Sequence, residues 1–376
     1  MGEVRRVRRC YGCGEVLQSD NPDLPGYADP WEMEHHEIVL CSHCFAEQRK
    51  KKKAANEPIL DTDFREILKQ AKTNKSLIIY VVDLFTFETS FNSEVAEEIK
   101  NNPLIVVANK ADLLPPKTNL DNIHDYVAKR VTDAHLNPLK IILTSVAQNY
   151  NIDEVIKTIF TYSEGKDIYF IGAYSSGKSA LINSLLKTYK NPTQKYISTS
   201  IYPNTTLQVI EIPIDEQHSM YDTPGLSLSN SYVGKMATER EVIHDLIPKT
   251  LVRGRNYFLK SKDALLFGGL AFIEVVSGAR AAYSIYMAPD IGIHKTSMSN
   301  ANEVFERIIR KKITRPISTL ISTSRDLDVY EIKVDYEDKC DIAISGLGWI
   351  SFVGNHQIIR VYVLNGISIY HGTAKV

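Results

Sequence analysis

The chain has 376 residues, more than one hydrophobic core usually serves, so its length predicts two or three domains. Hydrophobic residues make up 44% of the chain, and no apolar run approaches the about 20 residues of a membrane span, which excludes a membrane-spanning protein. The 44 basic and 45 acidic residues give a net charge of −1, so attraction to nucleic acid must come from local patches. The five cysteines and the lack of an apolar segment after the first arginines favour a cytoplasmic protein.

Two cysteine pairs near the N-terminus have the spacing C-x2-C, 27 residues, C-x2-C. Two such turns can place four thiolates tetrahedrally around Zn²⁺. We therefore expect residues 1–55 to form a zinc-finger domain, although His35, His36 and His43 are alternative ligands and Cys340 is expected at a strand edge. The predicted zinc ligands are Cys10, Cys13, Cys41 and Cys44.

Basic residues flank both cysteine pairs, as arginines at positions 5, 6, 8 and 9 and as the run from Arg49 to Lys53. A domain folded around the zinc ion would bring the two basic runs together, which suits contact with an RNA backbone. The alternative is an ordinary solvated face.

Residues 56–228 alternate short apolar runs with amphipathic stretches of helical length. Runs of four to six residues rich in Ile and Val are typical of buried parallel strands in an α/β sheet. The expected strands are Leu77–Val82, Leu104–Ala108, Ile141–Thr144, Ile168–Ile171 and Leu207–Ile212.

The sequence N-K-A-D directly follows the second of these strands. The carboxylate of Asp112 can accept two hydrogen bonds from guanine, from N1 and the exocyclic amine, and adenine has no such donor pair. Asn109 and Lys110 would hold the edge and the plane of the base. Each short motif could be an ordinary loop by itself, so the combination carries the prediction. The loop that closes over the base is predicted at Ser145, Val146 and Ala147.

A P-loop pattern, G-A-Y-S-S-G-K-S, lies between the strand ending at Ile171 and a helical sequence. Its glycines let backbone N–H groups face phosphates, Lys178 neutralises the β and γ oxygens, and the Ser179 hydroxyl can ligate Mg²⁺. A chance Gly/Ser turn is the alternative, which the flanking strand and helix disfavour. The predicted phosphate-binding residues are Gly172, Ser175, Ser176, Gly177, Lys178 and Ser179.

The sequence D-T-P-G follows further along, and its Asp222 would hold Mg²⁺ through water while the Gly225 N–H senses the γ-phosphate. Upstream, Thr206 is favoured for the second Mg²⁺ hydroxyl because it lies nearest the following strand, with Thr205 in reserve and a plain β-turn as the alternative. The predicted catalytic residues are Lys178, Thr206, Asp222 and Gly225.

Leu226 stands where Ras-type enzymes have the glutamine that orients water. A hydrophobic side chain cannot hydrogen-bond the nucleophile. Intrinsic GTP hydrolysis is therefore expected to be slow and to depend on a partner or a conformational step.

The motifs occur in a rotated order. A Ras-like domain presents the P-loop, the switch threonine, D-x-x-G, N-K-x-D and the base-closing loop in that order, and here the last two come first. Suppose that the two termini of an ordinary Ras-like domain are joined near Tyr162–Lys166 and the chain is reopened after D-x-x-G. Every strand then keeps its place in the sheet. The fold class predicted for residues 56–228 is therefore α/β, a circularly permuted Ras-like P-loop G domain.

Residues 229–376 begin with helix-like sequence and are expected to form a C-terminal α+β domain. Aromatic residues alternate with Ile and Val near the end, which favours a core over base stacking: Trp349, Phe352, Tyr362 and Tyr370. A helix expected at Asn302–Ile313 offers a second basic surface, or a solvated face, with Arg307, Arg310, Lys311, Lys312 and Arg315. The β-like segments are Asp328–Val334, Asp341–Val353 and Gln357–His371.

Over essentially its whole length the sequence resembles the YqeH-type circularly permuted GTPases. Besides the rotated motifs and paired cysteines, the likeness includes V-D-L-F-T-F from Val82 with Ser90-Phe91, I-H-K-T from Ile293, and the segment Asp341–Trp349. The resemblance implies a cytoplasmic or organellar GTPase in small-subunit ribosome assembly. It also implies a G domain between a zinc finger and a domain that binds RNA or protein.

Two positions depart from that family. Its P-loop usually has Asn where this chain has Ser175, and related GTPases use that Asn to help place a monovalent cation, so dependence on potassium stays open. The threonine turn begins Pro203-Asn204 instead of Pro-Gly, and Asn is the best substitute for Gly at positive φ.

The leading hypothesis is a GTP-hydrolysing switch using GTP/GDP, Mg²⁺ and Zn²⁺, whose nucleotide state sets its affinity for the small (30S) ribosomal subunit or its rRNA precursor. One alternative is a P-loop metabolic phosphotransferase, in which Asp112 would have no role. Another is a nucleotide-insensitive zinc-binding RNA scaffold, against which Lys178, Ser179 and Asp222 argue. The assembly step, the activator and the oligomeric state stay open.

Overall fold

The computed structural model describes residues 10, 17–35, 39–43, 62–188, 198–201, 208–226, 228–334 and 337–376. The chain divides into two compact units, Met1–Pro58 and Ile59–Val376. The first was expected to end at residue 55. The second contains both the expected G domain and the expected C-terminal domain. None of the helices in the described ranges has the length and hydrophobicity needed to cross a membrane.

The first unit is small. Its helix α1 spans Pro30–His35, and an isolated parallel bridge joins Gln18 to Tyr27. The core of its described part contains Leu17, Ala28 and Val39 together with Cys10 and Cys41.

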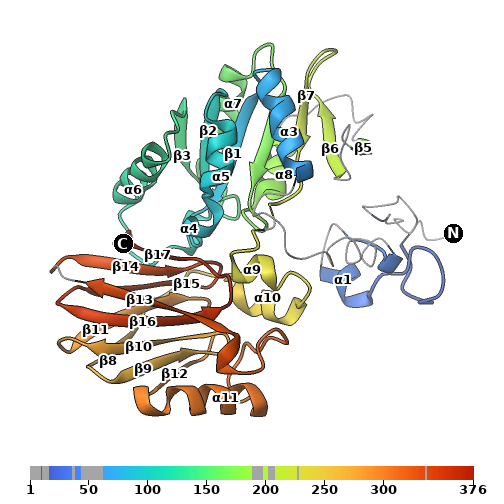
Figure 1. Ribbon diagram of the computed structural model, residues 1–376. Coiled ribbons are helices and arrows are strands. Elements are labelled where there is room, and N and C mark those ends of the chain that lie inside the picture. Colours follow the sequence, from blue (N-terminus) through green and yellow to red (C-terminus); the bar gives the residue numbers. More distant parts are fainter. Residues whose placement is uncertain are drawn as a thin grey trace. The chain divides into compact units, whose positions relative to one another are not determined.

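The G domain is built on a sheet whose seven strands, among the described residues, run in the order β3-β2-β1-β4-β7-β6-β5 (Figure 1). Strands β3, β2, β1, β4 and β7 are parallel to one another, whereas β6 is antiparallel to β7 and to β5. The strands are β1 Leu77–Asp83, β2 Leu104–Asn109, β3 Lys140–Leu143, β4 Ile168–Gly172, β5 Ser198–Ile201, β6 Gln208–Pro213 and β7 Ser219–Asp222.

The five strands expected in this domain are present within one or two residues of their predicted ends. The expectation that Leu207–Ile212 forms a parallel strand is wrong, because β6 pairs with β7 as a hairpin. A short loop closed by the bond from Ile214 N–H to His218 O reverses the chain there. An apolar run shows that a strand is buried but does not show its direction, and a loop this short permits only the antiparallel arrangement.

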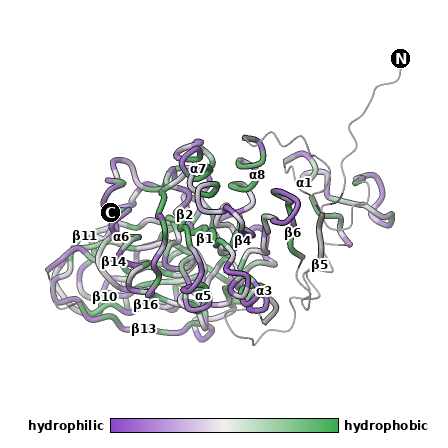
Figure 2. The backbone as a smooth tube through the Cα atoms, turned by 90° about the horizontal axis from the view of Figure 1, so that it is seen from above, coloured by the Kyte–Doolittle hydropathy of each residue, from purple (hydrophilic) through white to green (hydrophobic). Residues whose placement is uncertain are grey.

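Helices cover both faces of this sheet. Alternate residues of β1 face opposite ways: Ile78, Tyr80 and Val82 share a core with α3, α5 and α6, whereas Leu77, Ile79 and Val81 share one with α7 and α8. Both faces are therefore apolar, and β1, β2 and β4 are hydrophobic along their lengths (Figure 2). The helices are α3 Thr62–Thr73, α4 Phe87–Ser90, α5 Ser93–Ile99, α6 Leu120–Asp133, α7 Ile152–Tyr162 and α8 Lys178–Thr188.

The strand order agrees with the predicted permutation. The P-loop follows β4 in the middle of the sheet, the guanine motif follows β2, and Asp222 ends β7. Carboxyl ends of parallel strands meet at one edge, so the motifs gather there despite their rotated order. The chain passes from α7 to β4 through a tight turn closed by Lys166 N–H and Ser163 O.

The C-terminal domain contains two five-stranded sheets, with the orders β12-β9-β10-β16-β13 and β17-β14-β15-β11-β8 among the described residues. Helices α9 Tyr232–Lys235 and α10 Arg240–Leu246 precede the sheets, and α11 Ala301–Lys311 packs on β9 and β12. The strands are β8 Arg255–Leu259, β9 Asp263–Phe267, β10 Ala271–Ser277, β11 Ala281–Met287, β12 Ile293–Ser297, β13 Leu327–Val334, β14 Lys339–Ile344, β15 Gly348–Val353, β16 Gln357–Leu364 and β17 Ile369–Thr373.

The domain opens with helices α9 and α10, as expected, but strands β8 to β12, which were not expected, occupy most of residues 255–297. The expectation for Cys340 is wrong. Cys340 is fully buried in β14, which has neighbours on both sides, and therefore is not at a sheet edge. The predicted core role of the aromatic residues is confirmed for Trp349 and Phe352, which are 0% and 3% exposed.

Candidate nucleotide site

Asn109 joins the loops of the site. Its Nδ2 donates to the backbone oxygen of Ser176 in the P-loop at 3.0 Å, and its Oδ1 accepts from the N–H of Val146 at 3.2 Å. The side chain is buried. Asn109 was expected at the edge of the base, but its amide instead connects the guanine loop to the P-loop and the base-closing loop.

The carboxylate predicted to read guanine is held by the loop predicted to close over the base. The hydroxyl of Ser145 donates to Asp112 Oδ1 at 2.6 Å, and the same hydroxyl accepts from Gln148 N–H at 3.1 Å. Ser145 is buried and forms two backbone hydrogen bonds with Tyr150. Asp112 is half-buried, and within the described part of the chain its Oδ2 has no hydrogen-bond partner. This geometry leaves the carboxylate able to accept from guanine.

The P-loop has the backbone that its sequence requires. Ser175 and Gly177 have φ of 66° and 90°. A Cβ at Gly177 would lie 2.2 Å from Asn109 Nδ2, and one at Gly172 would lie 2.4 Å from the backbone oxygen of Val81. Both positions therefore need glycine. Ser175 adopts a left-handed conformation in which Asn is the more favourable residue.

Three functional side chains converge at the start of α8. The ammonium of Lys178 pairs with Asp222 Oδ1, and the hydroxyl of Ser179 donates to Asp222 Oδ2 at 3.1 Å. Both Lys178 and Asp222 are buried. Burial lowers the pKa of Lys178, and the charge of Asp222 opposes that shift. A carboxylate, a hydroxyl and an ammonium group in one place suit an Mg²⁺-bound phosphate chain.

Ser179 and Asp222 would hold the magnesium ion, which when bound neutralises charge on the phosphate oxygens. Lys178 would exchange its contact with Asp222 for the phosphates. The remaining predicted ligand, Thr206, and its alternative Thr205 lie outside the described residues.

The segment after Asp222 is fixed against the P-loop. Leu226 N–H donates to Gly172 O, and Tyr174 N–H donates to Leu226 O, both at 2.9 Å. A Cβ at Gly225 would lie 3.0 Å from the Cα of Tyr174. Leu226 is buried and packs in the core of the G domain, so its side chain orients no water.

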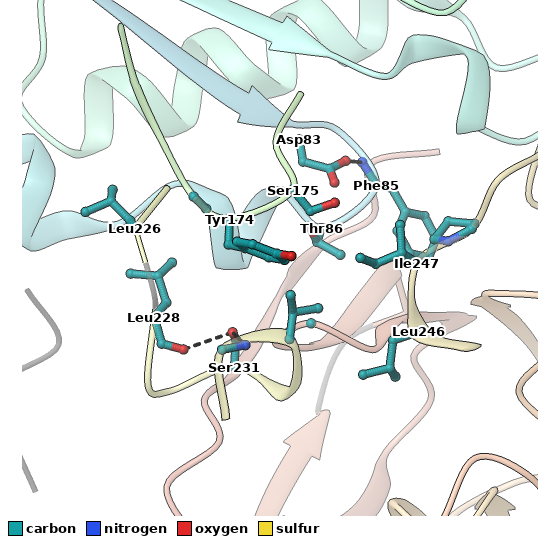
Figure 3. A pocket seen from close by; sticks show the side chains of 15 residues that line it. Asp83, Phe85, Thr86, Tyr174, Ser175, Leu226, Leu228, Ser231, Leu246 and Ile247 are labelled. Carbon is teal, nitrogen blue, oxygen red and sulfur yellow. Dashed lines mark hydrogen bonds between the residues drawn. The ribbon is translucent and has the colours of Figure 1, made fainter. Parts of the chain in front are cut away.

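A cavity adjoins the P-loop on the side of the C-terminal domain (Figure 3). Tyr174 and Ser175 line one wall, and Leu226 and Leu228 continue it. Further lining residues are mostly apolar and come from α9 and the residue before it, from α10 and from the residues after α10: Ser231, Val233, Gly234, Leu246, Ile247 and Pro248. The phosphate side of the nucleotide site and the C-terminal domain therefore share a boundary.

The predicted zinc ligands are described only in part. Cys10 and Cys41 are both buried, and Cys41 N–H donates to Cys10 Sγ at 3.2 Å. Cys13 and Cys44 lie outside the described residues. One residue from each predicted pair therefore lies beside the other in the core of the first unit.

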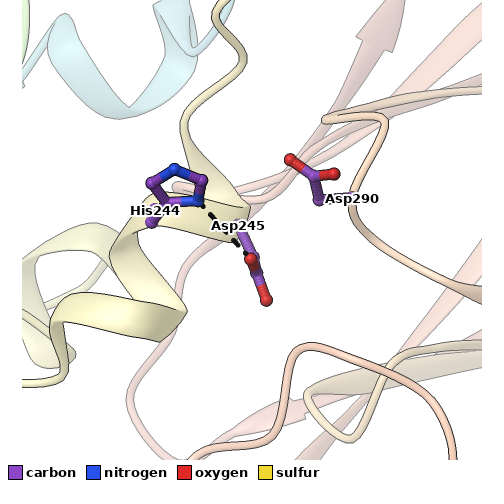
Figure 4. A group of neighbouring side chains, drawn as sticks. All are labelled: His244, Asp245 and Asp290. Atoms are coloured by element: carbon purple, nitrogen blue, oxygen red, sulfur yellow. Dashed lines mark ion pairs between the residues drawn. The ribbon is translucent and has the colours of Figure 1, made fainter.

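A second group with metal-ligand chemistry is formed by His244, Asp245 and Asp290 (Figure 4). Cationic side chains already contact it: the ammonium of Lys249 lies against His244 Nε2, and Arg315 Nε lies 3.3 Å from Asp245. These contacts disfavour a metal ion there. The side chain of Arg315 is exposed, as expected for the basic surface, and it also pairs with Glu241 and Asp245.

Comparison with known proteins agrees with this geometry. Residues 280–373 match a family model described as YqeH-like, C-terminal, and residues 167–259 match one described as 50S ribosome-binding GTPase. The uncharacterized protein YqeH of Bacillus subtilis is 31% identical over 361 residues, which cover 96% of this chain and 97% of that protein. The chain belongs to the YqeH family of GTPases.

The YqeH likeness extends to plant proteins. A putative nitric oxide synthase of Oryza sativa subsp. japonica is 32% identical over 379 residues, covering 91% of this chain and 69% of that protein.

Among solved structures, the GDP-bound structure of TM YlqF has 14% identity and a TM-score of 0.29, covering 47% of this chain and 65% of that one. As a YqeH-type GTPase, the protein binds GTP and GDP with Mg²⁺ and hydrolyses GTP.

We predict that Asp112→Asn changes the base preference from guanine to xanthine nucleotides. The amide can donate to the oxygen that replaces the exocyclic amine, and two charge-assisted hydrogen bonds to guanine are lost, so GDP affinity should fall about 100-fold. Competition binding with GDP, XDP and ADP measures the change.

The matched control is Asp121→Asn at the start of α6, an exposed carboxylate that should leave all three affinities unchanged. Equal competition by ADP and GDP at the wild-type site would contradict the assigned role of Asp112.

Proposed function

We propose that the protein is a GTP-dependent switch in assembly of the small (30S) ribosomal subunit, with the C-terminal domain as its output. The observation that carries this proposal is the short connection between switch and output. Tyr232, seven positions after Gly225, is already part of the C-terminal core.

Tyr232 is anchored on several sides. Its hydroxyl donates to Leu270 O at 2.7 Å and accepts from Leu364 N–H at 2.9 Å, and its own N–H donates to Ser345 O at 3.0 Å. The side chain is 0% exposed. A displacement of the segment after Gly225 therefore acts directly on the C-terminal domain.

The other end of the connection is the nucleotide sensor. Leu226 is hydrogen-bonded to the P-loop through both its N–H and its carbonyl oxygen, and Leu228 is buried in the G-domain core. Contacts from γ-phosphate to Gly225 would favour one geometry of this segment, and their loss on hydrolysis would release it. Because Leu226 replaces the water-orienting residue, we infer slow intrinsic hydrolysis and a long-lived GTP state.

The proposed partner is the small subunit or its rRNA precursor, supported by the family resemblance and by exposed basic groups. Helix α11 presents Arg307, Arg310 and Lys311 to solvent, and Lys312 follows at its C-terminus. Such a surface suits phosphate contacts. The model matched by residues 167–259 names the 50S subunit, so the large subunit is a second candidate.

We predict that wild-type protein binds the small subunit at least about tenfold more tightly in one nucleotide state than in the other, a difference of about 1.4 kcal/mol. Co-sedimentation with separately purified 30S and 50S subunits, in GDP and in a nonhydrolysable GTP analogue, measures it. Gly225→Ala should keep nucleotide binding yet lose the difference, because the added methyl presses on the backbone of Tyr174.

The control variant is Glu164→Ala, which changes an exposed side chain in the turn between α7 and β4. Equal affinity in both states, or a Gly225→Ala protein that still switches, would refute the coupling. Nucleotide-dependent binding to the 50S subunit alone would identify the large subunit as the partner in place of the small subunit.

We also propose that the first unit is a zinc finger, in which Cys10, Cys13, Cys41 and Cys44 bind the zinc ion. The protein purified under reducing conditions without chelator should contain one zinc per chain, and Cys13→Ser should lose it. GDP affinity should stay the same, because no guanine or phosphate motif lies in Met1–Pro58.

Cys340→Ser is the control for that experiment, since this cysteine is buried in β14 of the second unit and should not affect the metal content. Zinc well below one per chain in wild-type protein would contradict the assignment.

A further inference from the structure

Asp83 lies between the guanine loop and the C-terminal domain. It ends β1, which has the P-loop strand β4 on one side and the guanine strand β2 on the other. Its Oδ2 accepts from Lys110 Nζ at 2.7 Å, and its Oδ1 accepts from Phe85 N–H at 2.8 Å. Only 8% of the Asp83 side chain is exposed. Both carboxylate oxygens are therefore used within the protein.

The partner of Asp83 belongs to the guanine motif. Lys110 has φ of 69°, a left-handed conformation that is unusual for lysine, and its side chain is 18% exposed. A long side chain loses rotamer freedom when it is held in one place, and an ion pair with a buried carboxylate supplies that restraint. Asp83 thus fixes the lysine that was predicted to lie along the plane of the base.

We propose that Asp83 is a positioning residue for guanine nucleotides, which holds Lys110 in place and connects the base site to the C-terminal domain. The proposal rests on the GTPase activity and does not depend on a ribosomal partner. It is separate from the connection through Gly225, because it acts at the base and not at the γ-phosphate.

The route to the C-terminal domain begins at Phe85. The Phe85 ring is buried and packs against Trp349 of β15, with ring centroids 5.5 Å apart and an interplanar angle of 60°. Trp349 is itself stacked on Tyr286 at 4.8 Å. The residue that is bonded to Asp83 through its backbone is therefore held by an aromatic cluster of the other domain.

The guanine loop has a second contact with the same cluster. Leu113 ends the short helix η1, Ala111–Leu113, that begins immediately after Lys110, and it packs with Phe85 and Trp349. Its backbone oxygen accepts from Val252 N–H at 3.0 Å. The guanine loop thus contacts the C-terminal domain directly through Leu113, in addition to the route through Asp83 and Phe85.

Charged groups also meet at this boundary. Lys375 is buried, and its ammonium lies 3.8 Å from the centre of the Trp349 ring. Burial lowers the pKa of Lys375, while the carboxylates of Asp341, Glu88 and Asp83 oppose the shift. The charge of Asp83 therefore pairs with Lys110 of the guanine loop and also opposes the pKa shift of Lys375 in the C-terminal segment.

The first test is Asp83→Asn, which keeps the size of the side chain and an acceptor for Phe85 but removes the charge that pairs with Lys110. GDP, GTP and ITP affinities should each fall about tenfold and by the same factor. The factor should be the same because the lysine is predicted to contact the plane of the base and not the edge that distinguishes these nucleotides. The kcat at saturating GTP should change little. Asp83→Glu, which restores the charge, should recover most of the affinity.

Glu274→Gln is the matched control. This carboxylate is also buried, accepts from Tyr362 Oη at 2.8 Å, and lies in β10 of the C-terminal domain. It should leave nucleotide affinity unchanged. Unchanged affinity in Asp83→Asn, or a fall in kcat with affinity intact, would overturn the proposal.

A double-mutant cycle with Lys110→Met separates positioning from a general structural role. If Asp83 acts through Lys110, the double variant should bind GDP no more weakly than Lys110→Met alone. Additive losses would show that Asp83 acts by another route and would refute the proposal.

The connection to the C-terminal domain has its own spectroscopic test. The chain has two tryptophans, so Trp31→Phe leaves Trp349 as the only one. In the full-length Trp31→Phe protein, adding GDP should change Trp349 fluorescence, and Asp83→Asn should remove that change at saturating GDP. Fluorescence that does not respond to GDP, or an equal response in both proteins, would refute the connection.

Discussion

The nucleotide site depends on one buried carboxamide. Asn109 lies at the end of β2, and its amide bonds the P-loop after β4 and the loop after β3. Gly177 must be glycine partly because Asn109 Nδ2 occupies the space of its Cβ. A buried amide that lost these partners would leave several polar groups unsatisfied. The phosphate loop and the base loop are therefore held in register by a single side chain.

Two connections link this site to the C-terminal domain, and they start at opposite ends of the nucleotide. At the phosphate end, backbone hydrogen bonds hold Leu226 to the P-loop, and Tyr232 follows in the C-terminal core. At the base end, Asp83 and Phe85 lead to Trp349. The permutation produces the first connection, because the segment after D-x-x-G leaves the sheet instead of continuing into it.

Sequence predicted most of the G domain because its signals are local. Apolar runs identified five of its strands, and the P-loop pattern stands between a strand and a helix as expected. Strands β8 to β12 were missed: in β8 exposed and partly buried residues alternate and its polar positions obscure the signal of a strand, whereas β9 and β10 contain apolar runs of the kind that identified strands in the G domain. The roles of Asn109 and Asp83 were missed because they depend on partners far away in the sequence or in another loop.

Leu226 illustrates how one residue can set both the geometry and the rate of a switch. It is buried in an apolar core with Leu84 and Leu228 while its backbone pairs with the P-loop. A glutamine there would bury an amide without partners, at a cost of about 1 to 3 kcal/mol. The leucine therefore stabilises the docked segment, and for the same reason it orients no water. The docked segment and the proposed slow hydrolysis would thus be two consequences of one side chain, and the proposed long-lived GTP state would give the C-terminal domain time to act.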